Sequence, residues 1–283
     1  MGAFSGRSVL IIGASSGIGA ALAREWARQG ADVALAARRV DRLEAVARDC
    51  QAFGARAVAI PCDVTRDGDC EQAVARTRSA LGRLDVVVAN AGFGVQGTFE
   101  KLSLEDYRRQ FETNVFGVLR TAHASLAELT ATRGRLVVIG SVSGHVASPG
   151  ASAYAMSKFA VRALCEALRV EWLRRGVSVT LISPGFVQSE IHQVDNRGVH
   201  HPEAPDVVPR WLRMPSERAA RLTVRAAARR RREVVITGHG KAAVFLKRHV
   251  PWLVAAGIER LGIQSRPEAT RATSPDSPRT RHS

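Results

Sequence analysis

Two side chains suited to proton transfer, a phenol and an ammonium, lie four residues apart in the segment Tyr154-Ala-Met-Ser-Lys158. Residues with this spacing share one face of a helix. A free tyrosine has a pKa of about 10 and is a poor base at neutral pH. A cation beside it favours the phenolate and brings that pKa toward the working range. The pair therefore predicts a tyrosine that acts as a general acid or base.

A tyrosine and a lysine at this spacing are also common as a purely structural pair on helix surfaces. A third residue separates the two interpretations. Ser141 lies thirteen positions before Tyr154, just past a predicted strand over 135–139, where its hydroxyl can hydrogen-bond a substrate carbonyl oxygen. The chain contains only two tyrosines, which argues against a chance match. The three residues together predict chemistry between a carbonyl and an alcohol.

A glycine-rich turn, Gly13-Ala-Ser-Ser-Gly17-Ile-Gly19, follows a predicted strand over 8–12 and opens a predicted helix over about 19–29. Glycines permit a sharp turn and let backbone N–H groups at a helix N-terminus approach a pyrophosphate closely. Three glycines in a loop are weak support by themselves, but the strand before and the helix after supply the context of a dinucleotide site. The turn therefore predicts a bound dinucleotide.

The segment Ala37-Arg38-Arg39 follows the second predicted strand, 33–36. An acidic residue at this place would bind the ribose 2′-hydroxyl of NAD. A guanidinium instead holds a 2′-phosphate through paired, charge-assisted hydrogen bonds. The competing interpretation treats both arginines as solvated loop residues of an Arg-rich chain. The segment favours NADP(H) as the cofactor.

Short β-branched runs alternate with longer helical patterns along the chain, which is the signature of βαβ units and a parallel sheet. The predicted strands are 8–12, 33–36, 55–61, 84–89, 135–139, 177–182 and 233–237. The predicted helices are about 19–29, 42–53, 67–81, 103–132, 153–175 and 216–232, the last with Ser216 as its N-cap. We expect a single α/β domain, a doubly wound Rossmann-type parallel sheet of about seven strands flanked by helices.

Composition divides the chain into three parts. Residues 1–240 form the predicted dinucleotide-binding catalytic domain, with a proline-containing lid over about 186–215. Residues 241–263 form an apolar and basic helical extension. Residues 264–283, rich in Ser, Thr, Pro and Arg, predict a disordered tail. The lid residues Trp211, Leu212 and Met214 either line an apolar substrate pocket or hold the lid in place.

Composition also argues against several function classes. A hydrophobic content of 46% without a long uncharged apolar run predicts a packed core and no spanning helix. The N-terminus lacks the layout of a signal peptide, so we expect a cytoplasmic protein. The four cysteines form no C-x-x-C pair and have no histidines at zinc spacing, and we expect neither a metal nor disulfides.

Most of the net charge of +15 comes from residues 210–248. This segment contains twelve Lys and Arg residues and only two acidic residues, Glu217 and Glu233. A basic patch attracts nucleic acid or anionic lipid, but aromatic interleaving and zinc-finger spacing are absent, so no nucleic-acid partner is expected. The adjoining segment 242–262 is apolar but interrupted by Lys247-Arg248-His249 and Pro251. It predicts packing on the core or on another subunit, with peripheral membrane contact as the alternative.

The motifs occur in the order seen in short-chain dehydrogenases/reductases, which the chain resembles over about residues 6–240. They are Gly13-x3-Gly17-x-Gly19, Asp63, Asn90-Ala91-Gly92, Asn114, Ser141, Tyr154-x3-Lys158 and Pro184-Gly185.

The resemblance implies a role for each chemical group. Tyr154 would be the general acid and base, and Ser141 would orient the carbonyl. Lys158 would bind the nicotinamide ribose hydroxyls and, with the charged nicotinamide, lower the pKa of Tyr154. Asn114 would hold a water that extends a proton relay from Lys158.

The resemblance also implies the cofactor contacts. Asp63 and Val64 are expected at the adenine ring, and Asn90 is expected to stabilise the fourth strand beside the cofactor. The segment from Pro184 to Val187 is expected at the nicotinamide. The other expected contacts are Gly13, Ser15, Ser16, Gly17, Ile18, Gly19, Ala91, Gly92, Gly185 and Ser189, the last standing where the family often has Thr. Ser16 replaces a basic residue of many NADP-preferring members, so the NADP(H) prediction rests on Arg38 and Arg39.

We expect a hydride-transferring oxidoreductase that acts on an apolar, small-molecule carbonyl or alcohol as a homodimer or homotetramer. Two alternative functions compete with this prediction. A non-catalytic NADP(H)-binding regulatory or scaffold protein would keep the fold, but it would have no need for every chemical group. A sugar-nucleotide epimerase would need a larger substrate domain than 186–232 offers.

Overall fold

The computed structural model describes residues 2–204 and 208–261. The predicted tail over 264–283 and the end of the predicted extension, 262–263, lie outside this range. Seven parallel strands form one sheet in the order β3-β2-β1-β4-β5-β6-β7, which confirms the predicted fold class. The strands are β1 (Ser8–Ile12), β2 (Asp32–Ala37), β3 (Ala57–Pro61), β4 (Val86–Ala89), β5 (Arg135–Ile139), β6 (Ser178–Ser183) and β7 (Glu233–Val235).

The sheet is buried on both faces, as its apolar strand sequences require. Every residue of β1 and β4 is buried. Strand β1 lies at the centre, where Val9 is in register with Val33 of β2 on one side and Val86 of β4 on the other. The direction of strand addition reverses between β1 and β4, and ligands of open α/β sheets bind at such a reversal, outside the carboxyl ends of the strands.

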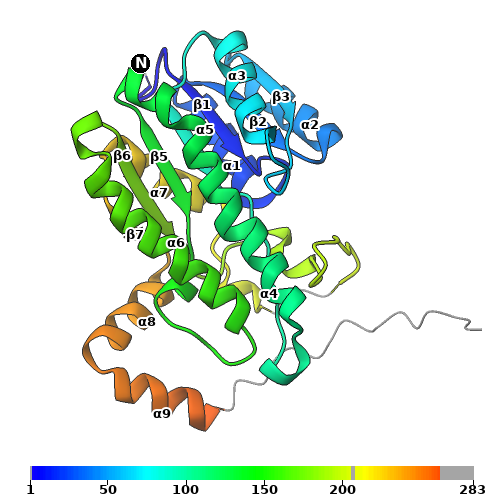
Figure 1. The fold of residues 1–283 in the computed structure, drawn as a ribbon, viewed down its shortest axis with the longest axis vertical. Coiled ribbons are helices and arrows are strands. Elements are labelled where there is room, and N and C mark those ends of the chain that lie inside the picture. Colours follow the sequence, from blue (N-terminus) through cyan, green and yellow to red (C-terminus); the bar gives the residue numbers. More distant parts are fainter. Residues whose placement is uncertain (1, 205–207, 262–283) are drawn as a thin grey trace, which may run out of the picture.

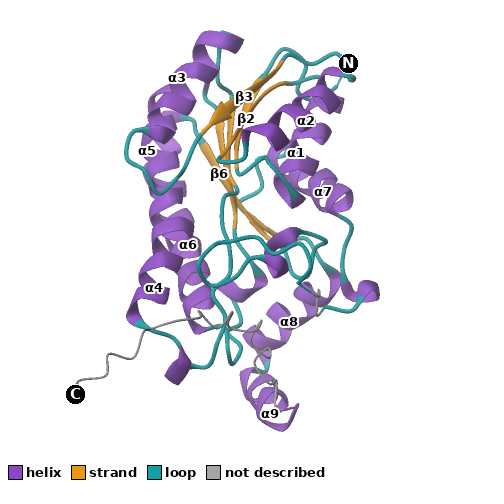
Figure 2. Ribbon diagram, turned by 90° about the vertical axis from the view of Figure 1, so that its right-hand side faces the viewer, coloured by secondary structure: helices purple, strands orange, loops and turns teal. Residues whose placement is uncertain are grey.

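Helices cover both faces of the sheet (Figure 2). One face packs against α1, α2 and α7, and the other against α3, α5 and α6. The helices are α1 (Gly17–Arg28), α2 (Val40–Gln51), α3 (Asp69–Leu81), α4 (Leu104–Phe111), α5 (Gly117–Thr132), α6 (Ser152–Glu171), α7 (Ser216–Ala228), α8 (Gly238–His249) and α9 (Pro251–Leu261). The side chains of α1 and α7 share one buried cluster with alternate residues of β1, including Val9 and Ile11.

The predicted helix over 103–132 contains an irregularity. A capping box between Ser103 and Asp106 starts α4, and a π-helical turn over Glu112–Phe116 joins it to α5. Such turns frequently lie at functional sites. This one carries the buried Asn114.

Helix α7 differs from the prediction at both ends. Pro215, not Ser216, is its N-cap, and the Ser216 hydroxyl donates to the carbonyl of Gln188 instead. The helix stops at Ala228, before the predicted 232, because Arg230 takes a left-handed conformation with φ +48°. Its guanidinium donates to the carbonyls of Arg133 and Gly176, which fixes the turn into β7.

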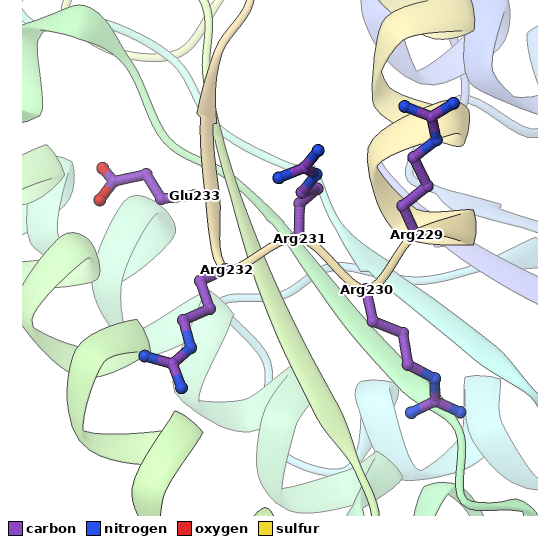
Figure 3. A pocket seen from close by; sticks show the side chains of 5 residues that line it. All are labelled: Arg229, Arg230, Arg231, Arg232 and Glu233. Carbon is purple, nitrogen blue, oxygen red and sulfur yellow. The ribbon is translucent and has the colours of Figure 1, made fainter.

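The basic side chains at this turn do not point toward a common site. A depression of about 610 Å³ at the start of β7 is lined by Arg229, Arg230, Arg231, Arg232 and Glu233. Figure 3 shows the side chains of Arg229 and Arg231 pointing to the opposite side from those of Arg230 and Arg232. The guanidinium groups therefore do not enclose a common ligand.

Helices α8 and α9 extend from the carboxyl end of the sheet as a separate arm (Figures 1 and 2). Several apolar side chains of this arm stay in contact with water, including Phe245, 62% exposed, and Trp252, 70% exposed. They do not pack on the core of their own chain. Within 2–204 and 208–261, no helix combines the length and apolar character needed to cross a bilayer.

Candidate active site

The expected site residues gather at one edge of the sheet. The carboxyl ends of parallel strands meet there, and each expected segment follows a different strand. The glycine turn follows β1, Asn90 follows β4, Ser141 follows β5 and Pro184 follows β6. The fold thus brings together groups that lie far apart in the sequence.

The glycine turn is too tightly packed to accept side chains. Gly13 and Gly17 adopt φ +88° and +52°, where L-residues are strained. A Cβ on Gly19 would lie 2.0 Å from the carbonyl oxygen of Gly13. That oxygen accepts a hydrogen bond of 2.8 Å from the side-chain amide of Asn90, which ties the turn to the end of β4. The turn leads into α1, whose N-cap Ser16 makes no side-chain cap hydrogen bond. The backbone is therefore suited to a pyrophosphate.

The two arginines after β2 differ in their surroundings. Arg38 is exposed. Arg39 turns back to the glycine turn, where its Nη2 donates to the Ser15 hydroxyl at 3.1 Å and to the Ser16 hydroxyl at 2.9 Å. Of the two, only Arg39 therefore contacts the glycine turn.

The three expected chemical groups lie together on α6 and the loop after β5. The hydroxyl of Ser141 hydrogen-bonds the phenol of Tyr154. The ammonium nitrogen of Lys158 lies 5.7 Å from the centre of the Tyr154 ring. Its position is fixed by a 3.0 Å hydrogen bond to the carbonyl of Ile139, at the end of β5. The Tyr154 ring also faces Gly94, where a Cβ would stand 3.6 Å away.

Burial sets the proton affinities of this group. It raises the pKa of Tyr154, and the hydrogen bond from Ser141 offsets only part of that effect. Burial also lowers the pKa of Lys158, from its usual 10.5 to about 8. In the protein alone, removal from water penalises the phenolate more than the Ser141 hydrogen bond favours it. The lowering of the Tyr154 pKa by Lys158 together with the charged nicotinamide stays a prediction. The chain by itself keeps Tyr154 protonated at neutral pH.

Asn114 holds the chain after β4 in place. Its Oδ1 accepts from the backbone N–H of Phe93 at 3.1 Å, and its Nδ2 donates to the Phe93 carbonyl at 3.0 Å. The same Nδ2 donates to the Ser157 hydroxyl on α6, 3.2 Å away. Asn114 thus links the π-helical turn to the helix that carries Tyr154. The proton relay through Asn114 stays a prediction.

The segment after β6 is anchored on two sides. The Gly185 N–H donates to the Thr237 hydroxyl, and the Phe186 N–H donates to His239, whose ring stacks on Phe186 at 5.5 Å. Val187 pairs with Met214 as an isolated bridge. Met214 therefore holds the two ends of the lid together.

Other lid and cofactor residues take less enclosed places. Trp211 is 84% exposed and projects from a short 3-10 turn. Ser189 begins another 3-10 turn, over Glu190–Gln193. After β3, the carboxylate of Asp63 accepts from the backbone N–H and hydroxyl of Thr65, which shapes the loop expected at the adenine ring.

The short-chain dehydrogenase model matches residues 7–199, across the glycine turn, the Ser141 loop and α6. The chain belongs to the short-chain dehydrogenase family. It is therefore an oxidoreductase, and the predicted family and the prediction of an oxidoreductase are confirmed. The chain is 37% identical over 210 residues to the oxidoreductase UcpA of Salmonella typhimurium, an alignment that covers 74% of this chain and 79% of that protein.

Solved structures of the family show similar folds. An alcohol dehydrogenase from Thermococcus sibiricus, complexed with 5-hydroxy-NADP, matches with a TM-score of 0.70 and 31% identity over 82% of this chain and 94% of its own. A short-chain dehydrogenase/reductase from Burkholderia phymatum, in complex with NAD, matches with a TM-score of 0.79 and 25% identity over 89% and 96%. The fold thus serves both kinds of dinucleotide, so the choice between them depends on each chain's own side chains.

Two residues near the glycine turn are not among those predicted from the sequence. Arg42, in the first turn of α2, and Glu190, in the lid, form an ion pair beside Arg39. The position of Arg42, three residues after Arg39, could have suggested it. Glu190 gave no signal, because the contact spans 151 residues of sequence.

Proposed function

We propose that this short-chain dehydrogenase uses NADP(H) to interconvert an apolar carbonyl compound and its alcohol, with Tyr154 as the general acid and base. The observation that carries the proposal is the half-buried phenol of Tyr154, hydrogen-bonded to Ser141 and flanked by the ammonium of Lys158. A non-catalytic NADP(H)-binding regulatory or scaffold protein would not need this phenol to be enclosed and protonated.

The cofactor, when bound, would supply or accept the hydride. In the reductive direction Tyr154 donates its proton to the carbonyl oxygen, since its raised pKa keeps the phenol protonated before the step. Ser141 orients that oxygen by a hydrogen bond. Lys158 places a positive charge beside the phenol, where it stabilises the phenolate that forms, and it also binds the ribose hydroxyls. Asn114 would hold the water that returns a proton.

The preference for NADP(H) is supported by the donors at the glycine turn. Arg39 stands beside Ser15 and Ser16, and Arg42 stands beside Arg39 through their shared partner Glu190. Guanidinium and hydroxyl groups together suit a 2′-phosphate. The segment that ends β2, Ala37-Arg38-Arg39, contains no acidic residue, whereas NAD-binding members of Rossmann folds place one there. The remaining contacts expected from the resemblance, from Asp63 to Ser189, are part of this proposal.

An apolar substrate is supported by the lid, which exposes Phe186 and Trp211 at the edge that carries Tyr154. We further propose a cytoplasmic homodimer or homotetramer, in which the exposed apolar side chains of α8 and α9 contact a second copy of the chain. Peripheral contact with an anionic membrane is the alternative use of the same arm, since Lys241, Lys247 and Arg248 accompany the apolar side chains.

The activity is tested by spectrophotometry of the purified chain. NADPH consumption is followed over ketones, aldehydes, quinones and steroids, and NADP reduction over aliphatic alcohols, each in parallel with NADH or NAD. Turnover of at least one apolar carbonyl, faster with NADPH than with NADH, is the expected result. Cofactor binding without turnover anywhere in the panel would favour the scaffold protein.

A further inference from the structure

A carboxylate from the lid lies between Arg39, which contacts the glycine turn, and Arg42, in the first turn of α2. Glu190 Oε2 accepts a hydrogen bond of 3.0 Å from Arg39 Nη1, and Glu190 Oε1 accepts one of 2.5 Å from Arg42 Nη1. His200 Nε2, also in the lid, lies 3.7 Å from Glu190 Oε2. The Glu190 carboxylate thus bridges the guanidinium groups of Arg39 and Arg42, which lie in the segment that follows β2.

The Glu190 carboxylate and the hydroxyls of the glycine turn accept hydrogen bonds from the same side chain, Arg39. The second amino group of Arg39 holds the hydroxyls of Ser15 and Ser16, and Ser16 also hydrogen-bonds Glu190. Burial raises the pKa of Glu190, but the bonds from Arg42, Arg39 and Ser16 outweigh that effect and hold it below the usual range. Glu190 is therefore ionised at neutral pH, and it uses the same donors that a 2′-phosphate would use.

The position of Glu190 is coupled to that of the lid. Its neighbour Ser189 lies directly over the glycine turn, so that a Cβ on Gly17 would stand 3.0 Å from the Ser189 Cβ. Ser189 caps the 3-10 turn over Glu190–Gln193, which lies within the lid. If the carboxylate leaves Arg39 and Arg42, the start of the lid loses its polar attachment to α2 and the β2 loop.

We infer that Glu190 competes with the 2′-phosphate of NADP(H) for Arg39 and Arg42 and thereby sets the balance between NADP(H) and NAD(H). The inference rests on the proposed dinucleotide site. A 2′-phosphate must displace the carboxylate, because two anions cannot share the same two guanidinium groups without repulsion. A ribose 2′-hydroxyl needs no displacement, since it can donate to a carboxylate, as it does in NAD-binding Rossmann folds. Here the carboxylate would come from the lid and not from β2.

The test measures binding and not turnover. Dissociation constants of NADPH and NADH are determined by isothermal titration calorimetry for the native chain, Glu190→Gln and Glu203→Gln. Glu203 is an exposed acid of the same lid and serves as the matched control. Glu190→Gln keeps the size of the side chain but removes its charge. We expect it to tighten NADPH binding about tenfold, the equivalent of about 1.4 kcal/mol, and to leave NADH binding unchanged or weaker.

Equal or weaker NADPH binding by Glu190→Gln than by Glu203→Gln would overturn the inference while leaving the proposed function intact. If the native chain bound neither NADPH nor NADH, both the inference and the proposed function would be overturned. A double-mutant cycle with Arg42→Ala distinguishes the loss of competition for the guanidinium from an indirect effect on the lid. Because the gain comes from a freed guanidinium, it should shrink in the Arg42→Ala background. A gain of the same size in that background would also contradict the competition.

Discussion

The ammonium of Lys158 lies 5.7 Å from the centre of the Tyr154 ring and donates to the carbonyl of Ile139 at 3.0 Å. Only 7% of Lys158 is exposed, and burial lowers its pKa to about 8. A cation held out of water destabilises the folded state unless an acid neutralises it, and the nearest hydrogen-bond partner of Lys158 is a neutral carbonyl. The protein thus keeps this charge beside the phenol at a cost in stability.

The first prediction follows from that cost. Lys158→Met should raise the free energy of unfolding at pH 7 by up to about 3 kcal/mol, because each unit of pKa shift corresponds to about 1.4 kcal/mol and the pKa moves from 10.5 to about 8. In the native protein the unfolded state binds more protons between these two pKa values, so stability rises as pH increases through that window. The variant should lose this rise, and it should also lose turnover.

Urea denaturation at pH 7 and pH 10 measures both effects. Lys241→Met is the control. Lys241 is exposed on α8, so this variant also removes one positive charge, but the charge that it removes is not buried. A Lys158→Met protein that is less stable than the native chain at pH 7 would show that the buried ammonium stabilises the fold.

The second prediction separates the two arginines after β2. Arg39→Ala should weaken NADPH binding by about 10- to 100-fold, because charge-assisted hydrogen bonds contribute about 1.5 to 3 kcal/mol and it is Arg39 that contacts Ser15 and Ser16. NADH binding should change little. The exposed neighbour Arg38 supplies the control, and Arg38→Ala should stay within about threefold of the native chain. Equal losses for NADPH and NADH on fluorescence titration would remove the case for a 2′-phosphate site.

The third prediction concerns the C-terminal arm. Replacing Phe245 and Trp252 together by Ser should convert a native oligomer into a smaller species, because these side chains are 62% and 70% exposed in the single chain. Light scattering coupled to size-exclusion chromatography measures the mass. Phe53→Ser changes an exposed aromatic residue elsewhere and should have no effect. An unchanged mass together with lost binding to anionic liposomes would assign the arm to a membrane.

The order of helices and strands could be predicted from the sequence. The spacing of apolar residues and the residues that end helices and strands, such as glycine, indicate the same elements along most of the chain. Near-continuous apolar runs such as Val86–Ala89 identify buried parallel strands, and Gly30 ends α1 with φ +85° as a glycine after a helix should. The predicted end of α7 is wrong because Arg230, not a glycine, makes the left-handed turn. That conformation depends on carbonyls of Arg133 and Gly176, which only the folded chain brings near.

The site was predictable where its residues follow local patterns. Tyr154 and Lys158 share a helix, and the spacing of their types was sufficient to place them together. The pKa of Tyr154 was not predictable in the same way, because burial depends on how the Ser141 loop, Gly94 and α6 pack. Glu190 was not predictable either, since its contacts with Arg39 and Arg42 join the lid to a loop at the other end of the sequence.

The proposed mechanism depends most on proton transfer by Tyr154. The chain provides a matched comparison in its second tyrosine, Tyr107, whose hydroxyl lies 2.6 Å from that of Ser152. Turnover of the best carbonyl found in the panel should be measured for Tyr154→Phe and Tyr107→Phe, together with the dissociation constant of NADPH. Tyr154→Phe should lose about 10²- to 10⁴-fold in turnover, the usual contribution of a general acid, while NADPH binding stays within about threefold and Tyr107→Phe remains active. Normal turnover by Tyr154→Phe would contradict the mechanism.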